Sequence, residues 1–597
     1  MSMLEYTVTP VDAPAHRYRV EMRARVRPGR PLRLNLATWI PGSYVIRDFA
    51  RHLLSIAAYC EGEAVPVTAV TRASWECLPT TAELVLVCEF HALDASVRAA
   101  YLDDRRGFFN FTSLAIRPEA LANAPCRVTL APPTGIDGWQ LATTLAADSV
   151  DGRGFGTYHA DSYWDLIDQP VAMGAAIEHV PFTVRDVPHA FVLLGRHDAD
   201  TRRLAADLAA VCEAQAAVFG ELPAAQYLFL AQIVARGYGG LEHRESSVLQ
   251  VARDALPAAL GPADGAAERS AAYETLLGLC SHEYFHLWNV KRIRPAAVAE
   301  SDLSEEAHFR DLWAYEGVTS YYDDLALVRA GLIDEQAYLD RLARLATRIE
   351  RTPGRHRQSL AQSSFDAWLK FYRPDENTPN AVVSYYGKGA QFALALDLML
   401  RLDTGERASL DDVMRRAWSE YGRHHTPMPE NGLAEIAGRV SGLELAAFFD
   451  HHLNTTADAP WAERLAAFGV RATCAPAGDD EAALLGRLGL RLAAGELPRV
   501  LHVLDGTPAR AAGLAAGDRL IAFDGLAVDD GLGGRLARHP AGARIAVHLL
   551  RGDELLERTV TLAAAAAPEW HLTIDDSADA AAHARRRRWL SHGHDAS

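Results

Sequence analysis

Two histidines and a glutamate in His282-Glu283-Tyr284-Phe285-His286 could do metal chemistry. On a helix, at about 100° per residue, the two imidazoles lie about 40° apart and can share one metal ion. Glu283 lies about 60° from His286, where its carboxylate can take a proton from water. Two imidazoles, a carboxylate and an open fourth position are typical of catalytic zinc, which lowers the pKa of the water that it binds. The segment predicts one Zn²⁺ per chain, with Glu283 passing the proton to the leaving amine.

The residues around this segment, Leu276 to Trp288, are otherwise mostly apolar. Two histidines and a glutamate on a buried helix need partners, because unpaired buried polar groups are costly. A shared metal supplies the partner, whereas core histidines with other hydrogen bonds and a surface glutamate are the plainer alternative.

A third metal ligand must come from further along the chain, and there are two candidates. Glu305 follows His286 after eighteen intervening residues, but Asp302 and Glu305 have the spacing of a capping box that opens a helix. Glu316 lies in the apolar run 312–318, where a buried carboxylate demands a cation. We select Glu316 and keep Glu305 as its competitor.

The elements that must position these residues change character along the chain. Residues 1–182 read as an antiparallel β domain, because stretches such as Tyr18 to Val26 alternate apolar and charged side chains. Residues 183–474 read as mixed α/β and then mainly helical. A polar linker at 475–482 precedes strands at 483–566, and 567–597 is expected to be a flexible tail. The fold class is therefore multidomain α+β.

The amino-acid composition argues against several classes of protein. The 597 residues carry a formal net charge of −17, which argues against nucleic-acid binding, and 49% hydrophobic residues suit globular domains. Seven scattered cysteines contain no CxxC pair, so neither a disulfide framework nor a zinc finger is indicated. We expect no membrane partner and a cytoplasmic location, since no signal or membrane-spanning pattern occurs. The basic run 585–588 reads as a solvated terminus, with an acidic or nucleic-acid contact as the alternative.

Further motifs accompany the histidine segment in a characteristic order. They are Gly239-Gly240-Leu241-Glu242-His243, Trp288-Asn289, Tyr315-Glu316-Gly317 and Tyr386-Gly387-Lys388-Gly389. With His282 to His286 they resemble the gluzincin metallopeptidases. Within these, Trp39-Ile40-Pro41-Gly42-Ser43-Tyr44, Arg47-Asp48-Phe49 and a carboxy-terminal PDZ-like domain make the chain similar to the glycyl aminopeptidase family. The resemblance covers nearly the whole chain, implies a thermolysin-like catalytic domain at 183–474, and places that family's third zinc ligand at Glu316.

The resemblance also implies roles for individual residues. Glu242 matches the glutamate that binds the free α-amino group of the substrate, and Gly239 and Gly240 beside it are further candidate substrate-binding residues. Tyr386 matches the tyrosine whose hydroxyl stabilises the tetrahedral oxyanion. The neighbouring Tyr385 is its rival, because residue type alone does not separate the two. Lys388 is expected to be structural.

The carboxy-terminal domain resembles a PDZ domain on Leu488-Gly489-Leu490, Gly506-Thr507-Pro508 and the segment 512–521. PDZ domains bind an extended peptide by strand addition, so a peptide carboxy terminus is a candidate partner. The segment expected to line the peptide groove, near Asp530 to Ala537, contains three glycines, which weaken a helix. Docking onto the catalytic domain is an equal alternative.

These observations predict a zinc aminopeptidase that acts on peptides with a free amino terminus. His282, His286 and Glu316 hold the metal, Glu283 activates water, and the family implies a preference for amino-terminal glycine or alanine. A zinc metalloendopeptidase and a non-catalytic PDZ scaffold are the alternatives. The oligomeric state is not predicted.

Overall fold

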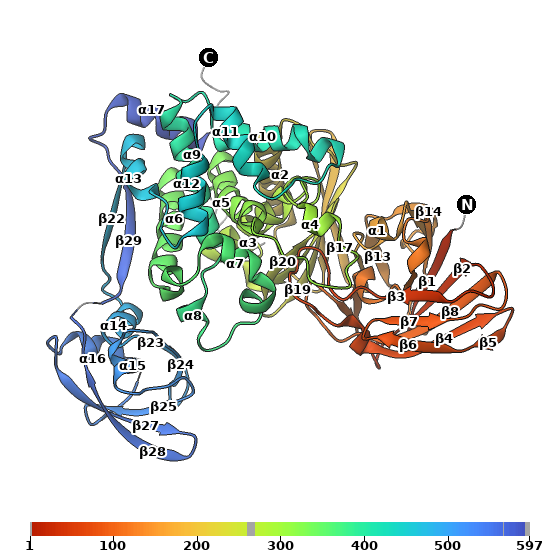
Figure 1. Cartoon of the computed structure of the whole chain (residues 1–597), viewed down its shortest axis with the longest axis horizontal. Helices are drawn as coiled ribbons and strands as arrows, with labels where there is room; N and C mark the ends of the chain where they lie inside the picture. Colours follow the sequence, from red (N-terminus) through yellow and green to blue (C-terminus); the bar gives the residue numbers. More distant parts are fainter. Residues whose placement is uncertain (1–2, 259–268, 530, 565, 592–597) are drawn as a thin grey trace. The chain divides into compact units, whose positions relative to one another are not determined.

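The computed structural model describes residues 3–258, 269–529, 531–564 and 566–591. The chain, drawn in Figure 1, divides into two compact units. The first comprises Met1–Ala307 and Ala417–Pro429, and the second comprises His308–Arg416 and Glu430–Ser597. A β-rich amino-terminal part, a helical middle part and a β-rich carboxy-terminal domain confirm the multidomain α+β class. No described helix combines the length and the apolar character needed to cross a membrane.

The amino-terminal part of the first unit is built on an eight-stranded sheet in the order β14-β15-β12-β1-β2-β8-β4-β5. Its strands are β1 (Leu4–Asp12), β2 (Arg17–Arg25), β4 (Leu53–Cys60), β5 (Glu63–Val65), β8 (Glu83–His91), β12 (Cys126–Leu130), β14 (Ala146–Val150) and β15 (Gly156–Ala160). The predicted alternation is confirmed in β2, where Tyr18, Val20, Met22 and Ala24 are buried. The sheet is antiparallel as expected, except that β1 and β12 are parallel.

Two four-stranded sheets complete this β-rich part. One contains β3 (Leu32–Asn35), β6 (Val67–Thr71), β7 (Ser74–Cys77) and β11 (Arg117–Pro118). The other contains β9 (Ala100–Leu102), β10 (Arg106–Phe109), β13 (Gln140–Thr143) and β16 (Val171–Gly174). The short helix α1 (Tyr163–Leu166) is capped by Ser162.

The remainder of the first unit combines a five-stranded sheet, in the order β17-β18-β19-β21-β20, with helices. Its elements are β17 (Ile177–Val184), β18 (Val187–Leu194), α2 (Thr201–Phe219), β19 (Tyr227–Val234), β20 (Tyr238–Glu242), β21 (Ser246–Ala252), α3 (Ala271–Phe285) and α4 (Ala296–Ala299). Strands β18, β19 and β21 are parallel, whereas the edge strand β20 pairs antiparallel with β21. The edge position leaves one side of β20 unpaired by strands.

Helices dominate the chain between the two β-rich regions. They are the π-helical turn η5 (Trp313–Gly317), α5 (Val318–Arg329), α6 (Glu335–Glu350), α7 (Leu360–Phe365), the π-helical turn η7 (Ala367–Phe371), α8 (Thr378–Ala381), α9 (Gly387–Asp403), α10 (Leu410–Glu420), α11 (Gly432–Ser441), α12 (Ala446–Asn454) and α13 (Trp461–Leu465). Helices α5 and α9 share a buried polar group, in which the Tyr321 hydroxyl donates to Asp397 at 2.6 Å and Arg401 pairs with the same carboxylate at 3.1 Å.

The carboxy-terminal β domain has its own apolar core. Its elements are α14 (Asp480–Arg487), β23 (Leu490–Ala493), β24 (Arg499–Val503), α15 (Pro508–Ala511), β25 (Arg519–Phe523), β26 (Leu526–Ala527), α16 (Leu532–Ala537), β27 (Arg544–Arg551) and β28 (Glu554–Thr561). The expected groove helix forms as α16 despite its glycines, while Asp530 lies outside the described residues. The predicted linker at 475–482 is wrong, because β22 (Val470–Pro476) and α14 occupy most of it.

The prediction of a flexible tail from 567 is wrong for the described residues. β29 (Pro568–Ile574) pairs with β22, and α17 (Ala580–Leu590) packs in the second unit with Trp589 fully buried. The indole of Trp589 donates to the Tyr321 hydroxyl at 2.9 Å. The polar composition of the segment hid this one aromatic anchor. Residues 592–597 lie outside the described residues.

The basic run is likewise not a solvated terminus. Arg585 donates to the Ala467 carbonyl at 2.7 Å, Arg586 pairs with Glu335 at 2.8 Å, and Arg588 pairs with Glu406 at 3.1 Å. These side chains therefore attach α17 to acidic and carbonyl groups of the same unit.

Replacing Trp589 by alanine tests whether the carboxy-terminal segment is part of the fold. Loss of a buried indole and of its hydrogen bond should cost about 3–5 kcal/mol and lower the melting temperature of the second unit. Differential scanning calorimetry measures this change. Arg587, exposed on the same helix, provides the matched control Arg587→Ala, which should melt like the wild type. A Trp589→Ala protein with wild-type melting would show that the segment is a free tail.

Candidate functional site

Helix α3 carries the histidine segment, and three hydrogen bonds fix its last turns. Gln215 on α2 donates to the Ser281 hydroxyl at 2.8 Å, and the Tyr227 hydroxyl on β19 donates to the Glu283 carbonyl at 3.2 Å. His189 on β18 and the hydroxyl of Tyr284 lie 2.9 Å apart. The helix therefore has a fixed rotation and height against the five-stranded sheet, which a metal site requires.

The two histidines stand next to each other at the end of α3. Their ring centroids are 4.7 Å apart, and the rings are nearly perpendicular. Nδ1 of His286 lies 2.8 Å from the Asn289 carbonyl, so Nδ1–H donates and Nε2 is the ring atom left to bind a metal. The sequence places Asn289 in a motif with Trp288, but its residue type does not predict this backbone contact.

Glu283 faces the edge strand β20, and a glycine there makes room for it. A Cβ atom added to Gly240 would lie 1.9 Å from Oε1 of Glu283, closer than any real contact. Ligand atoms of Glu242, Glu283 and His286 all lie within 4.8 Å of one another, and all three residues are buried. Glu283, the predicted base, and Glu242, the predicted anchor of the substrate amino group, therefore lie close together.

Glu242 ends β20 and lies against a loop of the amino-terminal β-rich part. A Cβ atom on Gly42 would lie 2.4 Å from Oε2 of Glu242, and the positive φ of Gly42 (94°) also favours glycine. Glu242 is only 4% exposed, and its Oε1 has no hydrogen-bond partner among the described residues. A buried carboxylate in this state is suited to a cation that arrives with a ligand. Gly42 was recognised as part of a motif, but its contact with Glu242, 200 positions away in sequence, was not foreseen.

Glu316 lies in the π-helical turn η5, directly before α5. Such turns often mark functional sites, because the extra residue alters the direction of nearby side chains. Glycines bring η5 and α9 together: a Cβ on Gly317 would lie 2.6 Å from the Cα of Gly389. Gly317 and Gly389 are therefore both required to be glycine, because their two backbones approach each other closely.

The tyrosine pair precedes α9. The Tyr386 hydroxyl lies 3.1 Å from that of Tyr372, and burial followed by the charge of Glu316 raises the pKa of Tyr386. For Tyr385, Glu316 contributes less than Tyr372 and Tyr386 do to its raised pKa. Tyr386 is therefore the better-placed hydroxyl relative to Glu316. Lys388 is buried and pairs with Asp458 at 3.1 Å, as a structural residue would.

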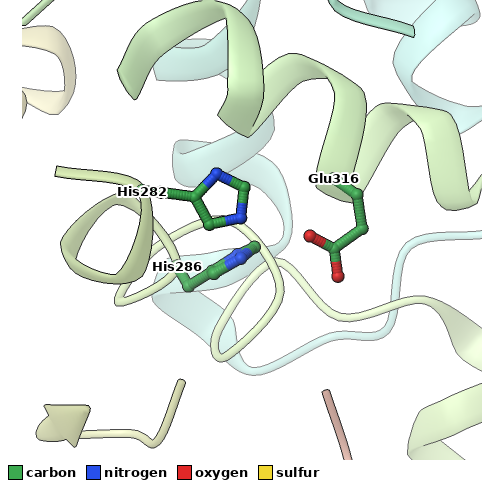
Figure 2. Close-up of side chains that lie close together, drawn as sticks. All are labelled: His282, His286 and Glu316. Atoms are coloured by element: carbon green, nitrogen blue, oxygen red, sulfur yellow. The ribbon is translucent and has the colours of Figure 1, made fainter. Parts of the chain in front are cut away.

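The three predicted ligands come together. Ligand atoms of His282, His286 and Glu316 all lie within 4.8 Å of one another, and Figure 2 shows the Glu316 carboxylate directed toward the two rings. The set fits zinc in kind and number of donors. The competitor Glu305 is exposed and belongs to neither group of metal-ligand type among the described residues. Its predicted capping box is also wrong, because Asp302 accepts from Ser304 in a turn and no helix follows.

A buried ion group next to Glu242 was missed by the sequence analysis. Asp168 accepts from Lys291 at 2.7 Å and lies 3.1 Å from Nδ1 of His243. Burial alone would raise the pKa of Asp168, but Lys291 and His243 hold it well below its usual range. Residues so distant in the chain gave no sequence signal. Asp168 therefore connects His243, the residue after Glu242, with Lys291, which lies five residues after His286.

Comparisons with known proteins show which family the chain belongs to. The family model for the M61 glycyl aminopeptidase matches residues 275–392, that for the peptidase M61 N-terminal domain matches 5–175, and that for the PDZ domain matches 486–562. A crystal structure of an aminopeptidase N family protein from Idiomarina loihiensis is 35% identical, with a TM-score of 0.92, and the match covers 98% of this chain and 100% of that one.

A more distant structural match is an M1 zinc metallopeptidase from Deinococcus radiodurans, 15% identical, covering 77% of this chain and 93% of that one with a TM-score of 0.46. A search of curated proteins finds no match.

The fold and the His-His-Glu group define a zinc metallopeptidase, which confirms the expected class of hydrolase. The chain belongs to the M61 glycyl aminopeptidase family, and it carries that family's N-terminal domain and a carboxy-terminal PDZ domain.

Replacing Gly240 by alanine tests the packing of Glu283 against β20. The added methyl group must displace the carboxylate, and a misplacement of about 1 Å can cost about 100-fold in rate. We expect kcat on a glycyl anilide to fall at least that far, with the zinc content and melting temperature near those of the wild type. Gly438→Ala, where the new Cβ meets only an ordinary 3.6 Å contact, is the control. Unchanged kcat in Gly240→Ala would contradict this packing.

Proposed function

We propose that the protein is a zinc aminopeptidase that removes small amino-terminal residues, glycine and alanine first, from peptides. The single observation that carries the proposal is the convergence of His282, His286 and Glu316. The second group of metal-ligand type, Glu242 with Glu283 and His286, offers only one imidazole and would consume both the base and the amine anchor. The first group suits catalytic zinc better and leaves both carboxylates for the reaction.

Glu242 binds the substrate. Its buried carboxylate, lacking a partner at Oε1, would accept a charge-assisted hydrogen bond from the α-ammonium group of the peptide. This contact requires a free amino terminus, so it selects aminopeptidase over endopeptidase action. It also fixes the first peptide bond, rather than a later one, beside Glu283 and His286.

Glu283 and Tyr386 act on the reacting atoms. Zinc, when bound, acidifies water and polarises the substrate carbonyl. Glu283 takes the proton of the attacking water and delivers it to the leaving amine, so it serves first as a base and then as an acid. The Tyr386 hydroxyl, held near Tyr372 and Glu316, donates a hydrogen bond to the developing oxyanion.

Glu283→Gln tests the proposed roles. The amide keeps the size of the side chain but cannot accept the proton, so kcat on a glycyl anilide should fall by about 10²–10⁴-fold. Elemental analysis should still find one zinc per chain, because Glu283 is not a proposed ligand. Full activity in this variant would contradict the mechanism.

The same assay separates the alternatives. Acetylation of the glycyl amino group removes the charge that Glu242 would bind, so the acetylated anilide should resist the wild-type enzyme. An endopeptidase would cleave both substrates, and a scaffold without activity would hold no zinc and cleave neither.

We infer that the PDZ domain serves mainly for docking rather than for binding free peptides. The strand β23 is at the edge of its sheet, where a peptide would add. Helix α14, however, lies along α16: a Cβ on Gly533 would be 2.4 Å from Asp480, and Arg487 donates to the His539 carbonyl at 2.7 Å. Helix α14 thus packs directly against the expected groove helix.

Contacts within the second unit support docking. Asn380 on α8 donates to the Val503 carbonyl at 2.9 Å, and its Oδ1 accepts from the Asp505 backbone at 2.9 Å. Nδ1 of His502 lies 2.9 Å from the Glu376 carbonyl. These bonds attach β24 and the turn after it to the helical part of the unit.

Peptide binding by the PDZ domain can be measured directly in the full chain. A fluorescent decapeptide ending in valine should bind no more tightly than about 1 mM, a free energy near −4 kcal/mol. Gly533→Val should push α14 away from α16 and tighten binding by at least about tenfold. Gly478→Ala, at an exposed position with open space around the new Cβ and no positive φ, is the control. Micromolar binding by the wild type would contradict a role limited to docking.

A further inference from the structure

The hydroxyl of Tyr386 has a second phenol hydroxyl beside it. Tyr372 lies fourteen positions earlier in the chain, and the two hydroxyl oxygens are 3.1 Å apart, within hydrogen-bond distance. Both side chains are half-buried, whereas the neighbouring Tyr385 is fully buried. The group that the proposed mechanism uses at the oxyanion is therefore in contact with a residue that the mechanism does not yet use.

Tyr372 takes its direction from a π-helical turn. It directly follows η7, and its backbone N–H donates to the Ala367 carbonyl at 3.2 Å. Such a turn contains one residue more than an α-helical turn, which rotates the side chain that follows by about 100°. Trp368 in the same turn is fully buried and anchors it. The turn therefore fixes where the Tyr372 side chain points.

Helix α7, directly before η7, is attached to both segments that carry site residues. The Ser363 hydroxyl donates to the carbonyl of Val383, three residues before Tyr386, at 2.5 Å. The Ser364 hydroxyl accepts from the backbone N–H of Trp313, the first residue of η5, at 3.1 Å. Helix α7 therefore holds η7 in place relative to the tyrosine pair and to the turn that carries the third predicted ligand.

The aromatic ring of Phe371 packs against the tyrosine pair. Its centroid lies 4.8 Å from that of Tyr385 and 5.7 Å from that of Tyr386, and the two tyrosine rings are 4.6 Å apart. Aromatic rings at such distances are in favourable contact. These contacts fix the position of the Tyr386 ring, but they do not orient its hydroxyl proton.

The number of protons decides which hydroxyl must donate. A phenol hydroxyl has one proton to donate, and its oxygen can accept another hydrogen bond at the same time. If Tyr386 donates to Tyr372, its proton is turned away from the substrate carbonyl. If Tyr372 donates to Tyr386, the Tyr386 proton can go to the oxyanion, which only accepts. Only the second arrangement stabilises the oxyanion.

We propose that Tyr372 is a positioning residue, which donates its hydroxyl proton to the oxygen of Tyr386 and so directs the Tyr386 proton to the oxyanion. The proposal rests on the aminopeptidase function above, in which Tyr386 is the donor to the oxyanion. Two hydroxyls in line also polarise each other, which strengthens the second hydrogen bond. Tyr372 acts on the reaction through Tyr386 and not by touching the substrate.

Tyr372→Phe tests this role, because it removes the hydroxyl and keeps the ring. We expect kcat on a glycyl anilide to fall about 3- to 10-fold, the usual effect of one hydrogen bond, with KM and zinc content near those of the wild type. In Tyr386→Phe, which loses the donor to the oxyanion, kcat should fall about 10²–10³-fold. A larger loss in Tyr372→Phe than in Tyr386→Phe would overturn this assignment of the two roles.

The double variant separates positioning from a structural role. If Tyr372 acts through Tyr386, Tyr372→Phe should lower kcat no further in a protein that already carries Tyr386→Phe. A structural role would instead lower kcat by the same factor in both backgrounds, and such additive losses would overturn the inference. An unchanged kcat in Tyr372→Phe alone would overturn it as well.

Tyr338→Phe provides the matched control. Tyr338 lies in α6 of the same unit, and its buried hydroxyl has no hydrogen-bond partner among the described residues, so its removal should leave kcat unchanged. Failure of the aminopeptidase function would look different: the wild type would then not cleave the glycyl anilide in a zinc-dependent way.

Discussion

The site depends on one electrostatic constraint: its buried carboxylates, Glu242 and Glu283, require positive charge nearby. Glu242, Glu283 and His286 have ligand atoms within 4.8 Å of one another, and Glu242 is nearly inaccessible to water. Two buried carboxylates this close together, out of water, are costly unless a cation pairs with them. Two cations from outside the chain can relieve this cost. In the proposed function a metal ion is one and the ammonium group of a substrate is the other, so the same constraint that destabilises the free protein provides specificity.

The carboxylates of the site can lie this close together because glycines leave room for them. Gly240 admits the Glu283 carboxylate, Gly42 admits that of Glu242, and Gly317 meets Gly389 beside Glu316 and Tyr386. At each point a Cβ atom would occupy the space that a functional side chain or a second backbone needs. The hydrogen bonds of α3 to β18, β19 and α2 then hold the histidine helix against this arrangement. The same few contacts therefore position the functional side chains and pack together the elements that carry them.

The parts of the site that the sequence predicted are those with a local physical signal. His282 and His286 followed from helical periodicity, and Glu316 followed from a carboxylate inside an apolar run. The π-helical turn at Glu316 and the contact of Gly42 with Glu242 were not foreseen, because both arise from tertiary packing.

The predictions of a flexible tail and of a capping box were wrong because composition and spacing do not show which contacts the folded chain makes. The residues of the carboxy-terminal segment are mostly small or charged, and this composition outweighed Trp570 and Trp589, although the indole of Trp589 anchors α17. Asp302 had the spacing of a helix cap, yet it closes a turn with Ser304 instead.

Anomalous X-ray scattering from crystals of the zinc-loaded protein, recorded on both sides of the zinc absorption edge, would locate the metal ion. We expect one anomalous peak per chain, within bonding distance of His282, His286 and Glu316, with Glu242 and Glu283 outside the coordination sphere. A peak bound by Glu242, Glu283 and His286, or one bound by Glu305, would contradict this expectation.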